Sequence, residues 1–148
     1  MTFKKPFEIL ISFMIEYRKS RKTDLKLLVD LDKQANKEIS WWKPLTYSQF
    51  LKIHSNYSIF LAIDNKQIIG YLSTEIKKQN KEEVLFLDNI FVLKEYRKKG
   101  ISKNLIFMFL EEYKRKYSKI KLYSPTSLER FYKKFGFKSK YITMVFEE

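Results

Sequence analysis

The chain of 148 residues contains no cysteine, a single histidine and only three glycines. The lack of cysteine excludes disulfides, thiolate nucleophiles and cysteine metal sites, and it is typical of a cytoplasmic protein. The single histidine, His54, argues against a histidine zinc site or a Ser-His-Asp triad, and its place late in a predicted helix favours a structural role. We therefore predict a protein without a bound metal.

The chain also lacks a hydrophobic run long enough to cross a membrane. Its apolar N-terminal stretch, residues 7–15, is interrupted by Glu8 and closed by Glu16 and Arg18, and no small-residue cleavage site follows. A membrane helix needs about 20 apolar residues. Because apolar and polar side chains alternate there, we predict a strand over residues 9–18 and no membrane partner.

Basic charge and aromatic side chains are abundant. Lys and Arg number 30 against 17 acidic residues, a formal charge of +13, while 17% of the residues are aromatic and 45% hydrophobic. This length and composition indicate one folded domain over residues 1–148. The charge favours a polyanionic partner such as nucleic acid, an anionic membrane or a phosphorylated cofactor. Because the basic residues are spread over every predicted element and no nucleic-acid motif is visible, a nucleic-acid-binding module is an alternative and not the leading hypothesis.

Hydrophobic periodicity predicts an α/β domain. Strands joined by short polar turns should pair antiparallel, whereas a strand reached through a long helix should lie parallel to the strand before that helix. In chain order, we predict strands over residues 9–18, 59–63, 68–76, 84–93, 119–123, 137–140 and 141–146, with helices over about 24–35, 47–53, 101–117 and 128–135.

The sequence Arg97-x-x-Gly100-x-Ser102 lies in a basic turn between the strand over 84–93 and the long helix. The first amides of a helix have no intrahelical partners, and the helix dipole adds positive potential there. Gly100 lets an anion approach the main chain closely. The turn therefore predicts a phosphate-binding site.

A second motif, Phe131-Tyr132-x-x-Phe135-Gly136-Phe137, follows about 35 residues later. Together the two motifs resemble those of the GCN5-related N-acetyltransferase (GNAT) superfamily, and the order of strands and helices is similar over almost the whole chain. Ser102 departs from that pattern, which usually has Gly or Ala there. The resemblance implies a central mixed, mostly antiparallel sheet of about six to seven strands, flanked by about four helices, with the fourth and fifth strands parallel and splayed apart.

The resemblance also implies acetyl-CoA as co-substrate, bound where those two strands separate. The main chain at Val92 and Leu93 would pair with the pantetheine amides. The pyrophosphate would lie on the helix N-terminus, with Arg97 as a flexible cation. The amides expected to hold it belong to Lys98, Lys99, Gly100, Ile101, Ser102 and Lys103.

Amine acetylation requires loss of a proton from the acceptor, and a lysine-like amine at pH 7 has a free-base cost of roughly 4.6 kcal/mol. Tyr132 matches the superfamily position that often protonates the leaving thiolate, although its helical spacing also suits a core aromatic. Asp88 is the candidate base because alternation places it toward the cleft, where burial would raise its pKa; a structural hydrogen-bonding role is equally open. Glu75 is a weaker candidate, an ordered water is another, and Ile120 stands where some members have a glutamate.

Trp41 and Trp42 are candidates for the acceptor pocket, with simple coverage of the sheet as the alternative. The leading hypothesis is direct acetyl transfer from acetyl-CoA to a primary amine, small or protein-borne, in a ternary complex. A non-catalytic CoA sensor of the same fold is a further alternative. By analogy with dimeric relatives, residues 1–11 are a candidate homodimer contact.

Overall fold

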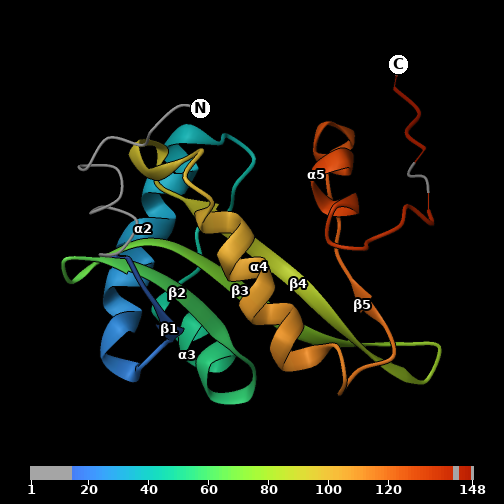
Figure 1. The fold of residues 1–148 in the computed structure, drawn as a ribbon, viewed down its shortest axis with the longest axis horizontal. Helices are drawn as coiled ribbons and strands as arrows, with labels where there is room; N and C mark the ends of the chain where they lie inside the picture. Colours follow the sequence, from blue (N-terminus) through green and yellow to red (C-terminus); the bar gives the residue numbers. More distant parts are fainter. Residues whose placement is uncertain (1–14, 142–143, 148) are drawn as a thin grey trace, which may run out of the picture.

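The computed structural model describes residues 15–141 and 144–147. These residues form one five-stranded sheet in the order β1-β2-β3-β4-β5, antiparallel except for the parallel pair β4–β5 (Figure 1). The predicted strand over 9–18 is seen from Ile15 onward, and its first part, with the candidate dimer contact, lies outside the described residues. The strands are β1 (Ile15–Lys19), β2 (Ile59–Asp64), β3 (Gln67–Gln79), β4 (Glu82–Val92) and β5 (Ile120–Lys121).

Helices cover both faces of the sheet. Helix α4 (Ile101–Tyr113) crosses one face, while α2 (Leu25–Glu38) and α3 (Tyr47–Asn56) lie on the other (Figure 1). Strand alternation explains the division, because successive side chains point to opposite faces. Tyr71 packs against Phe50 of α3, whereas Phe60, opposite Leu72, packs against Tyr113 of α4. The core is therefore two apolar layers separated by the sheet.

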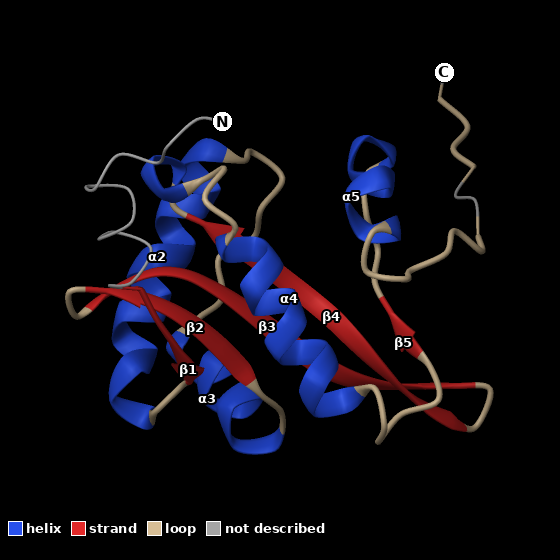
Figure 2. Ribbon diagram, in the orientation of Figure 1, coloured by secondary structure: helices blue, strands red, loops and turns tan. Residues whose placement is uncertain are grey.

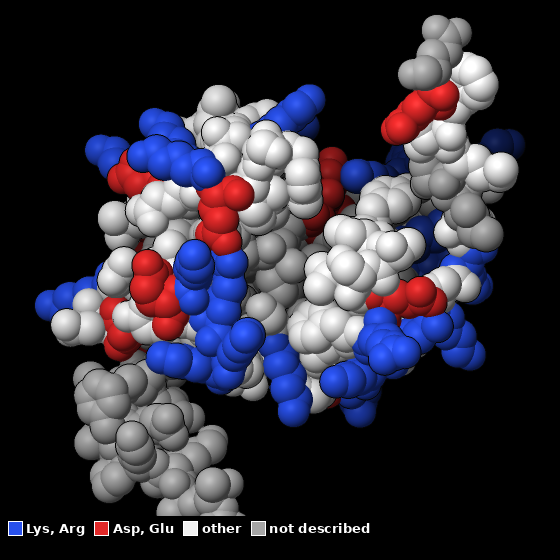
Figure 3. Space-filling model, turned by 90° about the horizontal axis from the view of Figure 1, so that it is seen from above, with Lys and Arg blue, Asp and Glu red and all other residues white. Residues whose placement is uncertain are grey.

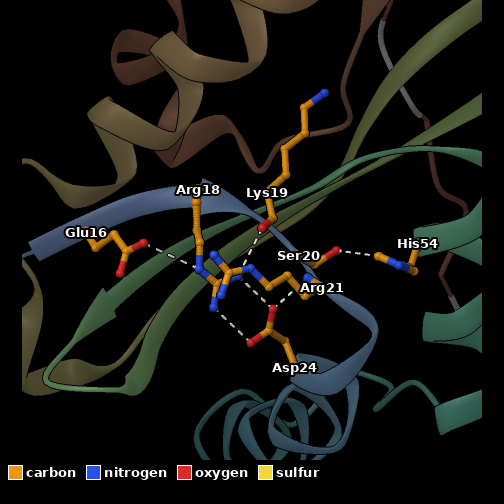
Figure 4. Close-up of polar contacts among 7 residues, drawn as sticks. All are labelled: Glu16, Arg18, Lys19, Ser20, Arg21, Asp24 and His54. Atoms are coloured by element: carbon orange, nitrogen blue, oxygen red, sulfur yellow. Dashed lines mark hydrogen bonds and ion pairs between the residues drawn. The ribbon is translucent and has the colours of Figure 1, made fainter.

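A partly buried ion pair connects β1 to the start of α2. Arg18 donates to both carboxylate oxygens of Asp24, at 2.7 and 3.0 Å, and the Arg21 amide donates to the same carboxylate at 2.6 Å (Figure 4). The guanidinium of Arg18 lowers the pKa of Asp24. Ser20 and His54 share a hydrogen bond of 2.8 Å beside this pair (Figure 4). In the structure, His54 thus ties α3 to the end of β1.

Two irregularities distinguish β4 from a regular strand, and together they leave a gap between β4 and β5. Ser73 of β3 pairs with Asn89 and Thr74 pairs with Leu87, so Asp88 is an extra residue in a β-bulge. On its other side β4 pairs with β5 only at Leu85 and Phe86. Among the described strands, none pairs with residues 87–92 on that side. Strands β4 and β5 are thus parallel, as predicted, and they separate after two residue pairs.

The end of the chain differs from the sequence prediction. Helix α5 (Glu129–Lys133) ends as expected near Gly136, which has a φ of 95°. The strands predicted over 137–140 and 141–146 are wrong for every described residue there, which is loop (Figure 2). Met144, Val145 and Phe146 are exposed, and none of them pairs with a described strand. The described sheet consequently has five strands, not six or seven, while the four predicted helices are present.

Within the described residues, no helix is both long and apolar enough to cross a membrane. Helix α4 is the most apolar of the long helices, and it ends at Tyr113, four residues before the predicted end. Its buried face, which includes Ile101, Leu105 and Phe109, lies against the sheet. Helix α4 is therefore a core helix whose N-terminus is anchored beside the end of β4.

Candidate functional site

The loop between β4 and α4 has the backbone of an anion site. After the short helix η2 (Lys94–Tyr96), Lys98 and Gly100 both have positive φ, at 61° and 78°, and Gly100 is the N-cap of α4. The first intrahelical bond runs from the Asn104 amide to the Gly100 carbonyl, so the amides of Ile101, Ser102 and Lys103 have no partner inside the helix. A Cβ at Gly100 would have nothing within 4 Å. The loop thus combines open space and amides that have no intrahelical partner with the cationic side chains of Arg97, Lys98, Lys99 and Lys103.

Arg97, the first residue of that motif, is already engaged by the protein. Its Nε donates to the Val92 carbonyl at 2.9 Å, its guanidinium forms an ion pair with Glu38 of α2, and it lies 5.6 Å from the centre of the Phe91 ring. Lys99 lies over the Tyr96 ring, 5.7 Å from its centre. Arg97 therefore joins the end of β4 to the end of α2.

The two residues predicted to pair with pantetheine have different main-chain environments. The Leu93 amide donates to the Ile69 carbonyl at 2.8 Å, which directs it toward β3. Because main-chain groups alternate in direction along a strand, Val92 presents its groups on the open side of β4. Its carbonyl there accepts the bond from Arg97. Of the two, Val92 has the geometry for pairing across the gap.

Tyr132 lies on α5, which follows β5 and lies on the β5 side of the gap (Figure 1). It is buried, with its ring 5.1 Å from that of Phe131 and 6.0 Å from that of Phe137. The rings of Phe107 and Phe135, with centres 5.5 Å apart, join α4 to the turn that follows α5. Burial raises the pKa of Tyr132, so the phenol keeps its proton at neutral pH. Both predicted roles, core aromatic and proton donor, are compatible with this position.

Asp88 is not the buried carboxylate that alternation predicts. It is exposed, and its Oδ1 lies 3.6 Å from Nζ of Lys77, which also lies 3.7 Å from Oε2 of Glu75. The bulge explains the error, because the extra residue has no partner on β3 and leaves the alternation. Lys77 was missed by the sequence reasoning, although the pattern Glu75-x-Lys77 places both side chains on one face of a strand.

The two tryptophans have different roles. Trp41 is 70% exposed, whereas Trp42 is buried and donates through Nε1 to Oδ1 of Asp32 at 2.7 Å. Asp32 is fully buried and also accepts from the Tyr71 hydroxyl and the Leu45 amide, both at 2.6 Å. Burial and the nearby Asp32 carboxylate raise the pKa of Tyr71 well above its ordinary value. Trp42 is therefore a fixed part of the core, and only Trp41 is free to meet a ligand.

The sequence reasoning missed Asp32 altogether. Its signal is a carboxylate on the apolar face of a helix, beside Leu28, Leu31 and Ala35. The network around Asp32 holds the loop after α2 against β3. This loop carries Trp41 and borders the same face of the sheet as Asp88.

Charge is distributed widely over the molecule. Lys and Arg side chains lie around the whole face seen in Figure 3, with acidic side chains between them. The described residues include no group of three or more His, Cys, Asp or Glu side chains placed to hold a metal ion. An open hollow of about 470 Å³ lies beside the loop, lined by Gln34, Asp64, Gln67, Leu93, Glu95, Tyr96 and Lys99.

Comparison with known proteins agrees with this geometry. The family model for the acetyltransferase (GNAT) domain matches residues 28–147. A search of curated protein sequences gave no significant match.

Solved structures of low sequence identity share the fold. A predicted acetyltransferase from Clostridium acetobutylicum, solved with acetyl-CoA, aligns with a TM-score of 0.74 at 21% identity, over 90% of this chain and 96% of that one. Glucosamine-6-phosphate N-acetyltransferase from Arabidopsis thaliana gives 0.71 at 20% identity, over 90% and 97%. An aminoglycoside acetyltransferase from an uncultured soil metagenomic sample, in complex with sisomicin, gives 0.69 at 13% identity, over 93% and 99%.

Proposed function

The chain belongs to the GNAT family of acetyltransferases, and from that premise we propose that it transfers the acetyl group of acetyl-CoA directly to a primary amine in a ternary complex. The observation that supports this most strongly is the loop of Arg97 to Lys103. Its left-handed Gly100, its three helix N-terminal amides and its cations fit a pyrophosphate. No cysteine is present to carry an acyl intermediate, which favours direct transfer.

The residues that would hold acetyl-CoA follow from the loop and the open edge of β4. The amides of Lys98 to Lys103 would bind the pyrophosphate, with Lys98, Lys99 and Lys103 as surrounding cations. Arg97 would leave Glu38 to reach the same phosphates, because its present partner is a surface carboxylate. Val92 would pair with the pantetheine arm as a neighbouring strand does. When bound there, acetyl-CoA supplies an activated acyl group at the inner end of the gap.

The chemistry requires one proton donor and one proton acceptor. Tyr132, kept protonated by burial, would protonate the departing sulfur. Asp88 would accept the proton of the acceptor amine, directly or through water, from its exposed position at the bulge. Trp41, exposed beside the core residue Trp42, would contact the acceptor. The neighbours that act on aminoglycosides and glucosamine 6-phosphate make amino sugars the first acceptors to test.

A thiol-release assay tests the proposal with unusually low background. Because the chain has no cysteine, a thiol reagent detects only the CoA that the reaction liberates. We expect acetyl-CoA-dependent thiol release with at least one amine from a panel of amino sugars, polyamines, amino acids and peptides. Failure of calorimetry to detect acetyl-CoA binding would remove the proposal.

A matched pair of variants tests the proton donor. Tyr132→Phe should lower kcat about 10²-fold with unchanged acetyl-CoA affinity, within the usual range for general acid catalysis. Tyr47→Phe, a partly exposed tyrosine on α3, is the control and should leave kcat unchanged. Full turnover by Tyr132→Phe would assign that side chain to the core alone. For Asp88→Asn, an unchanged pH–rate profile would remove Asp88 from the mechanism.

A further inference from the structure

Lys77 places its ammonium group between two carboxylates and an aromatic ring. Nζ lies 3.6 Å from Oδ1 of Asp88, 3.7 Å from Oε2 of Glu75 and 4.7 Å from the centre of the Phe86 ring. The side chains of all three charged residues remain 31–39% exposed. An alkylammonium is thus held at a defined place but is still accessible to a reactant.

This place lies where β4 becomes a free edge. Phe86 is the last residue of β4 that pairs with β5, and Asp88 is the bulge residue just beyond it. The ammonium of Lys77 therefore lies at the inner end of the gap. In the proposed complex, the thioester of acetyl-CoA would lie at this end of the gap.

The ammonium also lies on the face opposite to α4. Along β3, Tyr71, Ser73, Glu75 and Lys77 alternate onto the face that carries α2 and α3. Ser73 is fully buried there, and its Oγ has no hydrogen-bond partner among the described residues. Beside the bulge, that face thus carries one buried hydroxyl that has no hydrogen-bond partner among the described residues, in addition to the ammonium of Lys77.

We propose that Lys77 is an acetyl acceptor of this chain, acetylated within the same molecule. The inference rests on the proposed function, which supplies acetyl-CoA as the donor. A lysine ammonium, with a pKa of about 10.4, has few molecules in the free-base form at neutral pH. Fixed proximity offsets this, because well-oriented groups react as if present at concentrations on the order of 10⁵ M or more.

The reaction balances without any further reagent. Asp88 or water takes one proton from the ammonium, and Nζ then attacks the thioester carbonyl carbon. The N–C bond forms, the C–S bond breaks, and a second proton leaves the nitrogen while the sulfur departs as the thiol. The products are Nζ-acetyl-lysine, CoA and one released proton. Lys77 thereby loses its charge, and Glu75 and Asp88 lose the cation that they share.

The neighbouring residue Lys78 provides a control within the same molecule. Lys78 is exposed, and no ion pair with a described residue holds it. Uncatalysed acetylation by acetyl-CoA should therefore favour Lys78, because its side chain is more exposed and is not held by an ion pair with a described residue. Preferential reaction at Lys77 would reverse this chemical order, and only catalysis at the site can produce that reversal.

The experiment follows both lysines in the full chain. Purified protein is incubated with isotopically labelled acetyl-CoA and no amine, digested, and analysed by peptide mass spectrometry over time at two protein concentrations tenfold apart. We expect Lys77 to be acetylated at least ten times faster than Lys78, with a rate constant independent of protein concentration. Asp88→Asn should slow the reaction at Lys77 and leave that at Lys78 unchanged.

A parallel assay with external amines separates the two hypotheses. If wild-type protein acetylates an external amine while Lys77 reacts no faster than Lys78, the inference about Lys77 is overturned and the proposed function stands. A rate at Lys77 that rises in proportion to protein concentration would also overturn it, since the acceptor would then belong to another copy. If neither Lys77 nor any amine is acetylated and calorimetry detects no acetyl-CoA binding, both proposals fail.

Discussion

Arg97, in the loop that we propose binds the pyrophosphate, forms an ion pair with Glu38, the last residue of α2. The hydrogen bond from Arg97 lowers the pKa of Glu38, so the carboxylate stays charged at neutral pH. Any phosphate that recruits Arg97 must therefore compete with this carboxylate. The end of α2, which is remote in sequence from the loop, should therefore influence the anion affinity that we propose for the loop.

The first prediction concerns that competition. Glu38→Gln should tighten acetyl-CoA binding about 1.5- to 5-fold, because an exposed ion pair contributes about 0.2–1 kcal/mol. Glu111→Gln, which removes a similar surface pair with Lys114 on α4, is the control and should have no effect. Isothermal calorimetry measures both. Weaker binding by Glu38→Gln would mean that Glu38 orients Arg97 for the cofactor and does not compete for it.

The second prediction uses two glycines of similar conformation. Gly100 and Gly136 both have positive φ, and a Cβ at either position would meet nothing within 4 Å. Alanine at either site should therefore lower the free energy of unfolding by about 1–2 kcal/mol through backbone strain alone. Gly100→Ala should also weaken acetyl-CoA binding about tenfold more than Gly136→Ala does, because Gly100 is the N-cap of α4. Equal affinities in the two variants would contradict the assignment of the loop.

The third prediction concerns the buried carboxylate of Asp32. Asp32→Asn replaces one acceptor oxygen with a donor and leaves at least one of three buried hydrogen bonds unmade. The expected loss is about 2–3 kcal/mol in the free energy of unfolding, measured with urea. Trp42 should show altered fluorescence because its Nε1 partner changes. The exposed Asp30→Asn is the control, and an equally small effect in both variants would show that the network contributes no net stability.

The fourth prediction is a pH dependence. Arg18 lowers the pKa of Asp24 below its ordinary value of 3.8, so the pair stabilises the fold above that value and loses this contribution as pH falls through the lower folded pKa. Asp24→Asn should therefore be less stable than wild type by about 1.5–3 kcal/mol at pH 5–7. Urea unfolding should show this difference shrinking below about pH 4. A difference that stays constant down to pH 2.5 would contradict the prediction.

Local patterns predicted much of the fold. Helix α3 begins at the predicted residue 47, where Thr46 and Gln49 form a capping box, and β2, β3 and β4 lie where apolar residues and polar turns place them. The failure at residues 137–141 and 144–146 has a physical cause. Alternation shows that a segment can form a strand, but a strand exists only where it pairs with another strand, and the described residues of this segment pair with none.

The site was predictable where main-chain geometry dominates. Gly100 and the N-terminus of α4 lie as the loop motif predicts, because a glycine before a helix is a local signal. Asp88 and Asp32 were not predictable in this way. A bulge moved Asp88 to the surface, and the partners of Asp32 come from β3 and from the loop after α2. Local spacing places Asp32 on the apolar face of α2, but it does not identify these long-range partners.

The contact of β4 with β5 through two residue pairs has a thermodynamic consequence. Only these two strand pairings join the chain from β5 onward to the described sheet, so a ligand that spanned the gap would help to hold that segment against the rest of the molecule. By linkage, whatever loosens β5 or α5 must weaken ligand affinity, and ligand binding must protect that region from opening, by the same free energy. The change in ligand affinity and the change in the stability of β5 and α5 therefore both measure the same coupling free energy. Substitutions far from any ligand atom can therefore alter recognition simply by altering how firmly the chain from β5 onward is held.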